Sequence, residues 1–164
     1  MKEAVLVIIK PDGVNKGLVG NVFRKFTPSG LEIVGLKVFR ANRYLAEEHY
    51  THLRDTPFFE EIVTYLMGKY HKQKQIIGVI YYGEKAVSKC RAIAGATNPE
   101  EADPMSIRGA FGRITTKGVF ENVVHVSSDR KEAEREIKLW FQPDDLIEKL
   151  YPSKLATIKK RVWA

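Results

Sequence analysis

A histidine lies near the end of an apolar strand and just ahead of a helix start, which is a favourable place for a nucleophile that faces an anion. Residues Val119 to Val126 are mainly apolar and predict a strand that carries His125 close to its end. The Ser-Ser-Asp sequence that follows consists of N-cap residue types. Asp129 with Glu132 has the form of a capping box before a helix to about Phe141. Imidazole is nucleophilic and readily neutral near pH 7, and a helix N-terminus offers amide donors to an anion. The alternative is a hydrogen-bonded core histidine.

Glu136 is placed to orient this imidazole. The buried stripe of the predicted last helix consists of Ala133, Ile137, Trp140 and Phe141. Glu136 lies at the edge of that stripe, so its carboxylate points toward the interior, where an unpaired charge is costly. If this carboxylate accepts the proton on one ring nitrogen of His125, the other nitrogen is free to attack. The alternative is a surface glutamate paired with neighbouring lysine or arginine.

Short motifs elsewhere in the chain bring cations and turn residues toward the same site. Lys10-Pro-Asp-Gly follows the first apolar strand and predicts a turn with a cation at the sheet edge. The other motifs are Pro57-Phe-Phe, Gly95-Ala-Thr-Asn-Pro, Ile107-Arg-Gly and Asn122-Val-Val-His-Val-Ser. In order and spacing the set resembles the nucleoside diphosphate kinase family. The resemblance runs from about residue 3 to Leu146.

The resemblance implies an enzyme that moves the terminal phosphate of a nucleoside triphosphate to a nucleoside diphosphate. The implied route is ping-pong, through a phosphohistidine at His125. Glu136 falls where the family keeps a glutamate, and Ser127 matches the serine whose hydroxyl bonds it. The residues expected around the phosphates are Lys10, Tyr50, Arg91, Thr97 and Arg108. Phe58 is expected to stack on the base, in a slot also lined by Ile62 and Val119, and the ribose contacts are Lys10 and Asn122. Singly, each residue has an ordinary structural explanation, and only their joint occurrence favours this function.

The resemblance also implies Mg²⁺, bound with the nucleotide phosphates. We predict no dedicated protein metal ligands, because His49, His52 and His71 form no recognisable set and Mg²⁺ is commonly held by phosphates and water. Four positions depart from common family residues, and they are His52, Met105, Val126 and Ser128. The connection from Gly68 to Gln75 is also longer and more basic than usual. None of these departures removes a group that the chemistry needs.

The elements that must position these residues follow from hydrophobic spacing. Strands are predicted at Ala4 to Ile9, Leu31 to Ala41 and Gln75 to Tyr82, in addition to the His125 strand. Helices are predicted at Leu18 to Ser29, Leu45 to Arg54, Phe59 to Gly68, Glu84 to Ala94 and Asp129 to Phe141. The second and third helices form a pair broken at Thr56-Pro57. The order βαβ, helical insert, βαβ indicates an α/β (α+β) ferredoxin-like fold, a four-stranded antiparallel sheet with helices on one face.

Composition limits the class of protein. A length of 164 residues with 44% hydrophobic content suits one domain over residues 1–164, with a C-terminal tail from about residue 147. Cys90 is the single cysteine, so no intrachain disulfide or Cys-x-x-Cys metal site is expected. No apolar stretch approaches the length of a membrane span or a signal peptide core. We expect a cytoplasmic protein with no membrane partner.

The net charge of +7 favours polyanionic partners, which include nucleotides and nucleic acids. Basic clusters at Lys69 to Lys74 and Lys159 to Arg161 are more simply explained as solvated surface. The rival function is a nucleic-acid-binding or regulatory member of the fold with weak catalysis, and the intact cation and histidine set argues against it. The family resemblance, with aromatic tail residues such as Trp163, also implies a homo-oligomer, a tetramer or hexamer.

Overall fold

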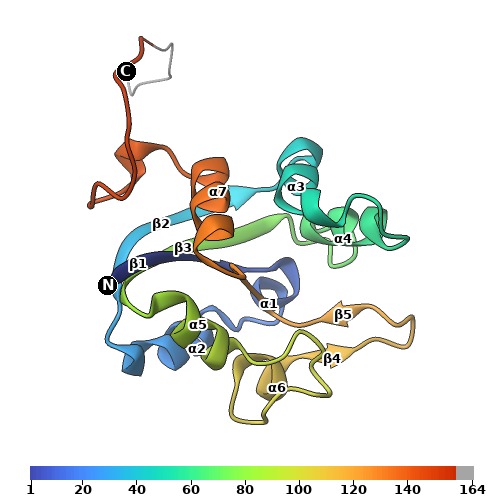
Figure 1. Cartoon of the computed structure of the whole chain (residues 1–164). Helices are drawn as coiled ribbons and strands as arrows, with labels where there is room; N and C mark the ends of the chain where they lie inside the picture. Colours follow the sequence, from blue (N-terminus) through green and yellow to red (C-terminus); the bar gives the residue numbers. More distant parts are fainter. Residues whose placement is uncertain (158–164) are drawn as a thin grey trace.

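Four antiparallel strands form the central sheet of the computed structural model, which describes residues 1–157 (Figure 1). The strands are β1 (Lys2–Ile9), β2 (Glu32–Arg40), β3 (Gln75–Glu84) and β6 (Val124–Val126), in the order β2-β3-β1-β6. This confirms the predicted ferredoxin-like sheet. Strand β1 pairs with β6 so that Ile8 lies opposite His125, which fixes the histidine against the centre of the sheet. The Lys159–Arg161 cluster, Trp163 and the end of the predicted tail lie outside the described residues.

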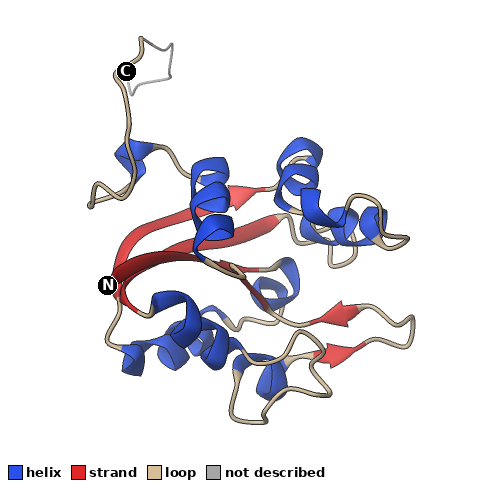
Figure 2. Cartoon of the chain, viewed as in Figure 1, coloured by secondary structure: helices blue, strands red, loops and turns tan. Residues whose placement is uncertain are grey.

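Helices cover both faces of this sheet, so the prediction of helices on one face was wrong. Along β1, alternate side chains enter two separate cores: Val5 belongs to one core and Leu6 to the other, and both are fully buried. The first core contains α2 (Val19–Phe26) and α5 (Ala86–Ala94). The second contains α3 (Arg43–His49), α4 (Phe59–Leu66) and α7 (Arg130–Trp140) (Figure 2). A strand that is apolar on both faces shows no alternation of apolar and polar residues. The continuous apolar run of β1 therefore indicates that both faces of the sheet are covered.

Turn residues end most helices where the sequence predicts. Helix α2 continues into a 3₁₀ turn at Thr27–Ser29 and stops at Gly30, whose φ of +67° suits glycine. Helices α3 and α4 are separated at Pro57, as predicted, but α3 ends at His49 and a 3₁₀ turn at Thr51–Leu53 replaces the end of the helix predicted to Arg54. The Lys10-Pro-Asp-Gly segment differs from the prediction, because it is the first turn of α1 (Pro11–Asn15) instead of an open turn. Proline is well suited to that first helical position.

The strand predicted over residues 119–126 is divided by a strained turn. Its first part is β5 (Phe120–Glu121), which pairs with β4 (Arg113–Ile114) in a short hairpin, and its second part is β6. Between them Val123 has a φ of +67°, and the Val124 amide donates to the Asn122 carbonyl at 2.7 Å. This conformation costs a β-branched residue roughly 1–3 kcal/mol. The Asp12 carboxylate holds it by accepting from the Val123 amide at 2.9 Å.

The long connection before β5 contains one further helix, α6 (Ile107–Phe111). Its N-cap is Ser106, whose hydroxyl accepts from the Gly109 amide at 3.1 Å. Met105, just before the cap, does not have a positive φ, so this position does not need the backbone freedom of glycine. Within residues 1–157, no helix combines the length and apolar character that a membrane crossing requires.

Candidate active site

The strand and helix that flank His125 meet as the sequence predicts. β6 ends one residue beyond His125, and α7 begins after Asp129, whose Oδ1 accepts from the Glu132 amide at 2.9 Å. The capping box is only half formed, because the Glu132 carboxylate bonds the Arg135 guanidinium at 2.8 Å. The remaining half of the cap still fixes the start of α7 and thereby the direction in which Glu136 projects.

His125, Glu136 and Ser127 form a hydrogen-bonded set. Nε2 of His125 lies 2.9 and 3.0 Å from the two carboxylate oxygens of Glu136, and the Ser127 hydroxyl donates to Oε2 of Glu136 at 2.5 Å. Burial alone raises the pKa of Glu136, but the adjacent His125 ring and the Ser127 hydroxyl outweigh it and lower the pKa to about 2. The carboxylate is therefore ionised and accepts the Nε2 proton. Nδ1 bonds no described residue.

His49 packs directly against the His125 ring, and sequence reasoning missed this contact. The two ring centroids are 4.3 Å apart in an edge-on arrangement. His49 is fully buried, and its Nδ1 accepts from the Trp140 indole at 3.2 Å. Burial and the neighbouring His125 hold the pKa of His49 well below its usual value, so His49 is neutral. A neutral ring supports His125 sterically without repelling its charged form.

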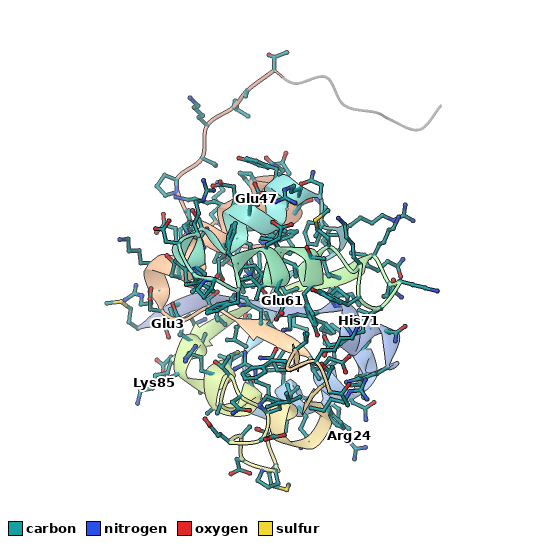
Figure 3. All side chains as sticks on the ribbon, turned by 90° about the vertical axis from the view of Figure 1, so that its right-hand side faces the viewer. Glu3, Arg24, Glu47, Glu61, His71 and Lys85 are labelled. Atoms are coloured by element: carbon teal, nitrogen blue, oxygen red, sulfur yellow. The ribbon has the colours of Figure 1, made fainter. Side chains whose placement is uncertain are left out.

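A cleft of about 820 Å³ opens in front of His125. All the predicted site residues except Ser127 line it, and these are Lys10, Tyr50, Phe58, Ile62, Arg91, Thr97, Arg108, Val119, Asn122, His125 and Glu136. Ser127 is fully buried behind Glu136. Figure 3 faces the side where α4, with Glu61 labelled, lies above the β4–β5 hairpin, and these two elements form opposite walls.

Two buried cations in this cleft lack a carboxylate partner among the described residues. Arg108 is 7% exposed, and its guanidinium donates to the carbonyls of Gly95 at 2.8 Å and Val124 at 3.0 Å. Burial, with repulsion from Arg91, lowers the pKa of Arg108 to about 10, which leaves it charged. Lys10 is also 7% exposed, with Nζ 4.6 Å from the Tyr65 ring centroid. Buried charges without partners are costly, so the cleft is suited to a polyanion.

The opposite end of the cleft is apolar. Phe58 is 47% exposed, while Val119 is buried on the facing wall. Asn122 also lines the cleft, and its side-chain amide donates to the Thr97 carbonyl at 2.8 Å. The Asn122 Oδ1 is buried and bonds no described residue, so it can still accept a hydrogen bond. The cleft is therefore cationic at His125 and apolar at its far end.

Comparison with known proteins identifies the group to which such a cleft belongs. The profile of the family described as nucleoside diphosphate kinase matches residues 3–146. The chain belongs to this family. A nucleoside diphosphate kinase of Pyrococcus horikoshii is 41% identical over 150 residues, 92% of this chain and 90% of that protein. Nucleoside diphosphate kinase A of Mus musculus is 40% identical over 146 residues, 89% of this chain and 90% of that protein.

Solved structures of the nucleoside diphosphate kinase family share the fold. The kinase of Halobacterium salinarum, solved in complex with CDP, has a TM-score of 0.80 at 33% identity and covers 91% of this chain and 93% of that one. The kinase of Borrelia burgdorferi, solved as a transition-state mimic with vanadate and ADP, has a TM-score of 0.80 at 28% identity, with 90% and 92% covered. Family membership makes this chain a nucleotide-binding phosphotransferase that acts as a nucleoside diphosphate kinase.

Several residues of the nucleoside diphosphate kinase cleft were not predicted. Tyr65, Glu61 and His52 line it but belong to no motif, and only their proximity to Phe58 in sequence could have indicated them. Among the described residues, His49, His125 and Glu136 are the one group whose ligand atoms, all within 4.8 Å, could hold a metal ion. Two of its members are already joined by the His125–Glu136 hydrogen bonds.

Proposed function

We propose that this nucleoside diphosphate kinase works by a ping-pong mechanism in which Nδ1 of His125 carries the phosphate. The observation that carries the proposal is the pair of contacts from His125 Nε2 to Glu136, which leave Nδ1 as the nitrogen with a lone pair toward the cleft. Glu136 is ionised, so it favours the tautomer with the proton on Nε2.

The transfer then consists of two matched displacements. The Nδ1 lone pair forms a bond to the terminal phosphorus, and the bond from that phosphorus to the bridging oxygen breaks, so the nucleoside diphosphate leaves with those electrons. The ring becomes positively charged, which Glu136 stabilises at 2.9 Å. An oxygen of the second nucleoside diphosphate attacks the same phosphorus and restores the neutral imidazole. No other group needs to store a proton.

Different residues of the cleft bind the phosphates, the base and the ribose of the nucleotide. We assign the phosphates to Lys10, Tyr50, Arg91, Thr97 and Arg108, which surround the cationic end. The base stacks on Phe58 beside Ile62 and Val119, and the ribose hydroxyls meet Lys10 and Asn122. The buried, unpaired cations support the first assignment, and the exposed Phe58 ring supports the second.

The donor set of the cleft fits Mg²⁺ that arrives with the nucleotide. Of the three lining carboxylates, Glu136 is engaged by His125 and Ser127, and Glu132 by Arg135, which leaves Glu61 as the one with no hydrogen bond or ion pair to a described residue. The phosphates and water would therefore supply most ligands of the ion. When bound, Mg²⁺ neutralises phosphate charge, while the residues of the chain hold and orient the nucleotide.

A phosphoenzyme assay tests this proposal. Incubation with γ-labelled ATP is expected to give a protein-bound phosphate that is acid-labile and base-stable, and addition of a nucleoside diphosphate is expected to discharge it. His125→Ala removes the nucleophile and is expected to abolish the label while ADP still binds. His52→Ala removes another histidine of the cleft and is expected to retain the label. Label on the His125→Ala variant would refute the mechanism.

We also propose a homo-oligomer, a tetramer or hexamer, with the edge strand β2 at a subunit contact. Ile33, Leu36 and Val38 of this strand are 43%, 56% and 58% exposed, which is unusual for apolar residues on a sheet edge. One domain over residues 1–164 and a cytoplasmic location remain part of the proposal. The single buried cysteine, Cys90, is in keeping with a reducing compartment.

A further inference from the structure

Glu121 is a buried acidic residue between two residues of the cleft wall, Phe120 and Asn122, and no motif explains its role. It ends β5, next to Asn122, and its side chain is 6% exposed. Both carboxylate oxygens are engaged. Oε2 lies 2.8 Å from Lys16 Nζ and 2.6 Å from Arg113 Nε, and Oε1 lies 2.8 Å from His71 Nε2.

The three partners of Glu121 come from three separate segments. Lys16 follows α1, His71 lies in the long connection between α4 and β3, and Arg113 lies in β4 opposite Glu121. His71 is labelled in Figure 3, and its Nε2 lies 2.8 Å from Oε1 of Glu121 in the hairpin. Strands β4 and β5 have two residues each, too few to hold a hairpin in place by their own pairing. The contacts of Glu121 with Lys16 and His71 therefore fix the hairpin to the rest of the domain, and its ion pair with Arg113 joins the two strands of the hairpin.

The charge of this cluster is suited to its place beside a phosphate-binding cleft. Burial would raise the pKa of Glu121, but hydrogen bonds from Arg113, Lys16 and His71 lower it to about 2. The carboxylate is thus ionised at any pH where the protein works. Because Lys16 and Arg113 each carry a positive charge, the cluster presents no net negative charge to a nucleotide.

Glu121 also anchors the chain just before the strained turn at Val123. Asp12 holds the far side of that turn through the Val123 amide, and Glu121 holds the near side. The residue between them is Asn122, the proposed ribose contact, and Val119 lies two residues before Glu121 on the same wall. Movement of Glu121 would carry both contacts away from the cleft.

We propose that Glu121 is a positioning residue that holds the base and ribose contacts Val119 and Asn122 against the nucleotide. It acts through its ion pairs with Lys16 and Arg113 and its hydrogen bond with His71, and it does not touch the reacting phosphate. This inference rests on the proposed nucleotide contacts of Val119 and Asn122.

Glu121→Gln tests this role, because it keeps the shape of the side chain and removes its charge. We expect the KM for ADP to rise about tenfold, the factor that corresponds to loss of one polar contact. We expect kcat and the rate of His125 phosphorylation at saturating ATP to change less than about threefold. The matched control is Glu134→Gln on α7, an exposed glutamate paired with Lys138, which is expected to change neither quantity.

Tripolyphosphate distinguishes positioning from a general electrostatic effect. This probe has phosphates but no base or sugar, so its inhibition constant is expected to stay unchanged in Glu121→Gln while ADP binds more weakly. Unchanged or tighter binding of ADP would overturn the inference, as would equal weakening of both ligands. An equal loss in kcat and kcat/KM with KM unchanged would also overturn it, because that pattern indicates damage to the chemistry.

Arg113→Gln provides a second variant that keeps the inference testable if Glu121→Gln folds poorly. The Arg113 side chain is 64% exposed, so its replacement leaves the core intact. We expect the same selective rise in KM for ADP, and a double variant no worse than the more severe single one. Additive effects would overturn the inference. Absence of a phosphoenzyme in the unaltered protein would instead refute the proposed function, and the two failures are thereby distinguished.

Discussion

Glu136 is negatively charged although it is buried, and this charge is central to the proposed role of His125. A lone carboxylate at 2% exposure would become protonated, but the His125 ring and the Ser127 hydroxyl supply three contacts of 3.0 Å or less. The same contacts that keep Glu136 ionised fix the tautomer and rotation of His125. Orientation and electrostatic stabilisation therefore come from one residue.

Glu136→Gln separates these two contributions. Glutamine can still accept the Nε2 proton through its amide oxygen, but it cannot stabilise the positive ring formed during transfer. We expect normal folding and a single-turnover phosphorylation rate lower by about 10- to 100-fold. Rapid-quench measurement with saturating ATP gives this rate directly. An unchanged rate would show that the carboxylate is only a packing residue.

The pKa of Lys10 determines how we expect kcat/KM to depend on pH. Burial is the largest effect on its pKa, which is lowered to about 8 even though Asp12 opposes the shift. Because the folded protein loses the Lys10 proton above that pKa, phosphate binding weakens there. We expect kcat/KM to fall as pH rises through about 8. Lys10→Arg keeps the charge, so its profile is expected to stay flat over this range, and the same fall in that variant would assign the titration to another group.

At the scale of elements, local sequence signals predicted most of the strands and helices that position the site. Contacts between distant residues determined the features that were not predicted. The apolar runs, Pro57 and the Asp129 cap predicted most strands and helices, because each signal acts within a few residues, although α3 spans Arg43–His49 and not Leu45 to Arg54. The division of the His125 strand could not be predicted, because Val123 is held in its strained conformation by Asp12, 111 positions away. Four valines in this segment favour a continuous strand by local propensity.

Local signals do not report contacts between distant segments, and this explains which site residues could not be predicted from the sequence. Glu136 was found because helical spacing places it at the edge of the buried stripe of α7, and the family resemblance then favoured it over a surface glutamate. His49 meets His125 only because α3 packs on α7 on one face of the sheet, and the Glu121 cluster joins four segments. No periodic pattern reports such contacts.

The N-cap of α7 gives a prediction for this element. Asp129→Ala removes the acceptor for the Glu132 amide and is expected to lower the free energy of unfolding by about 1 kcal/mol. Denaturant unfolding at fixed protein concentration measures the change. Lys131→Ala, at an exposed position of the same turn, serves as the control and is expected to have little effect. Equal stability of the two variants would show that the cap is dispensable.

At the scale of the whole molecule, the site depends on the entire sheet. Lys10 follows β1, Arg108 lies in α6, and His125 lies in β6, so the cleft exists only when these elements are assembled. The opposite edge of the sheet, β2, contributes no residue to the cleft. This edge is therefore available for a subunit contact, which its exposed apolar residues favour.

An irregularity in β2 brings these residues onto one surface. The register with β3 shifts between Ile33 and Gly35, and such a shift lets Ile33 share a face with Leu36 and Val38 although its spacing from them is odd. An edge strand with an apolar face and unpaired backbone groups readily pairs with a second copy. Subunits joined there leave every cleft open.

Charge on this face is expected to separate the subunits without harming the chemistry. In the Leu36→Lys/Val38→Lys double variant, apposed lysines repel and the apolar contact is lost, so we expect a smaller species by sedimentation velocity. Tyr44→Lys places the same charge on an exposed aromatic of α3 and is expected to leave the assembly unchanged. Labelling of His125 reports whether the dissociated chain is still folded. An unchanged sedimentation coefficient in a folded double variant would place the subunit contact elsewhere on the molecule.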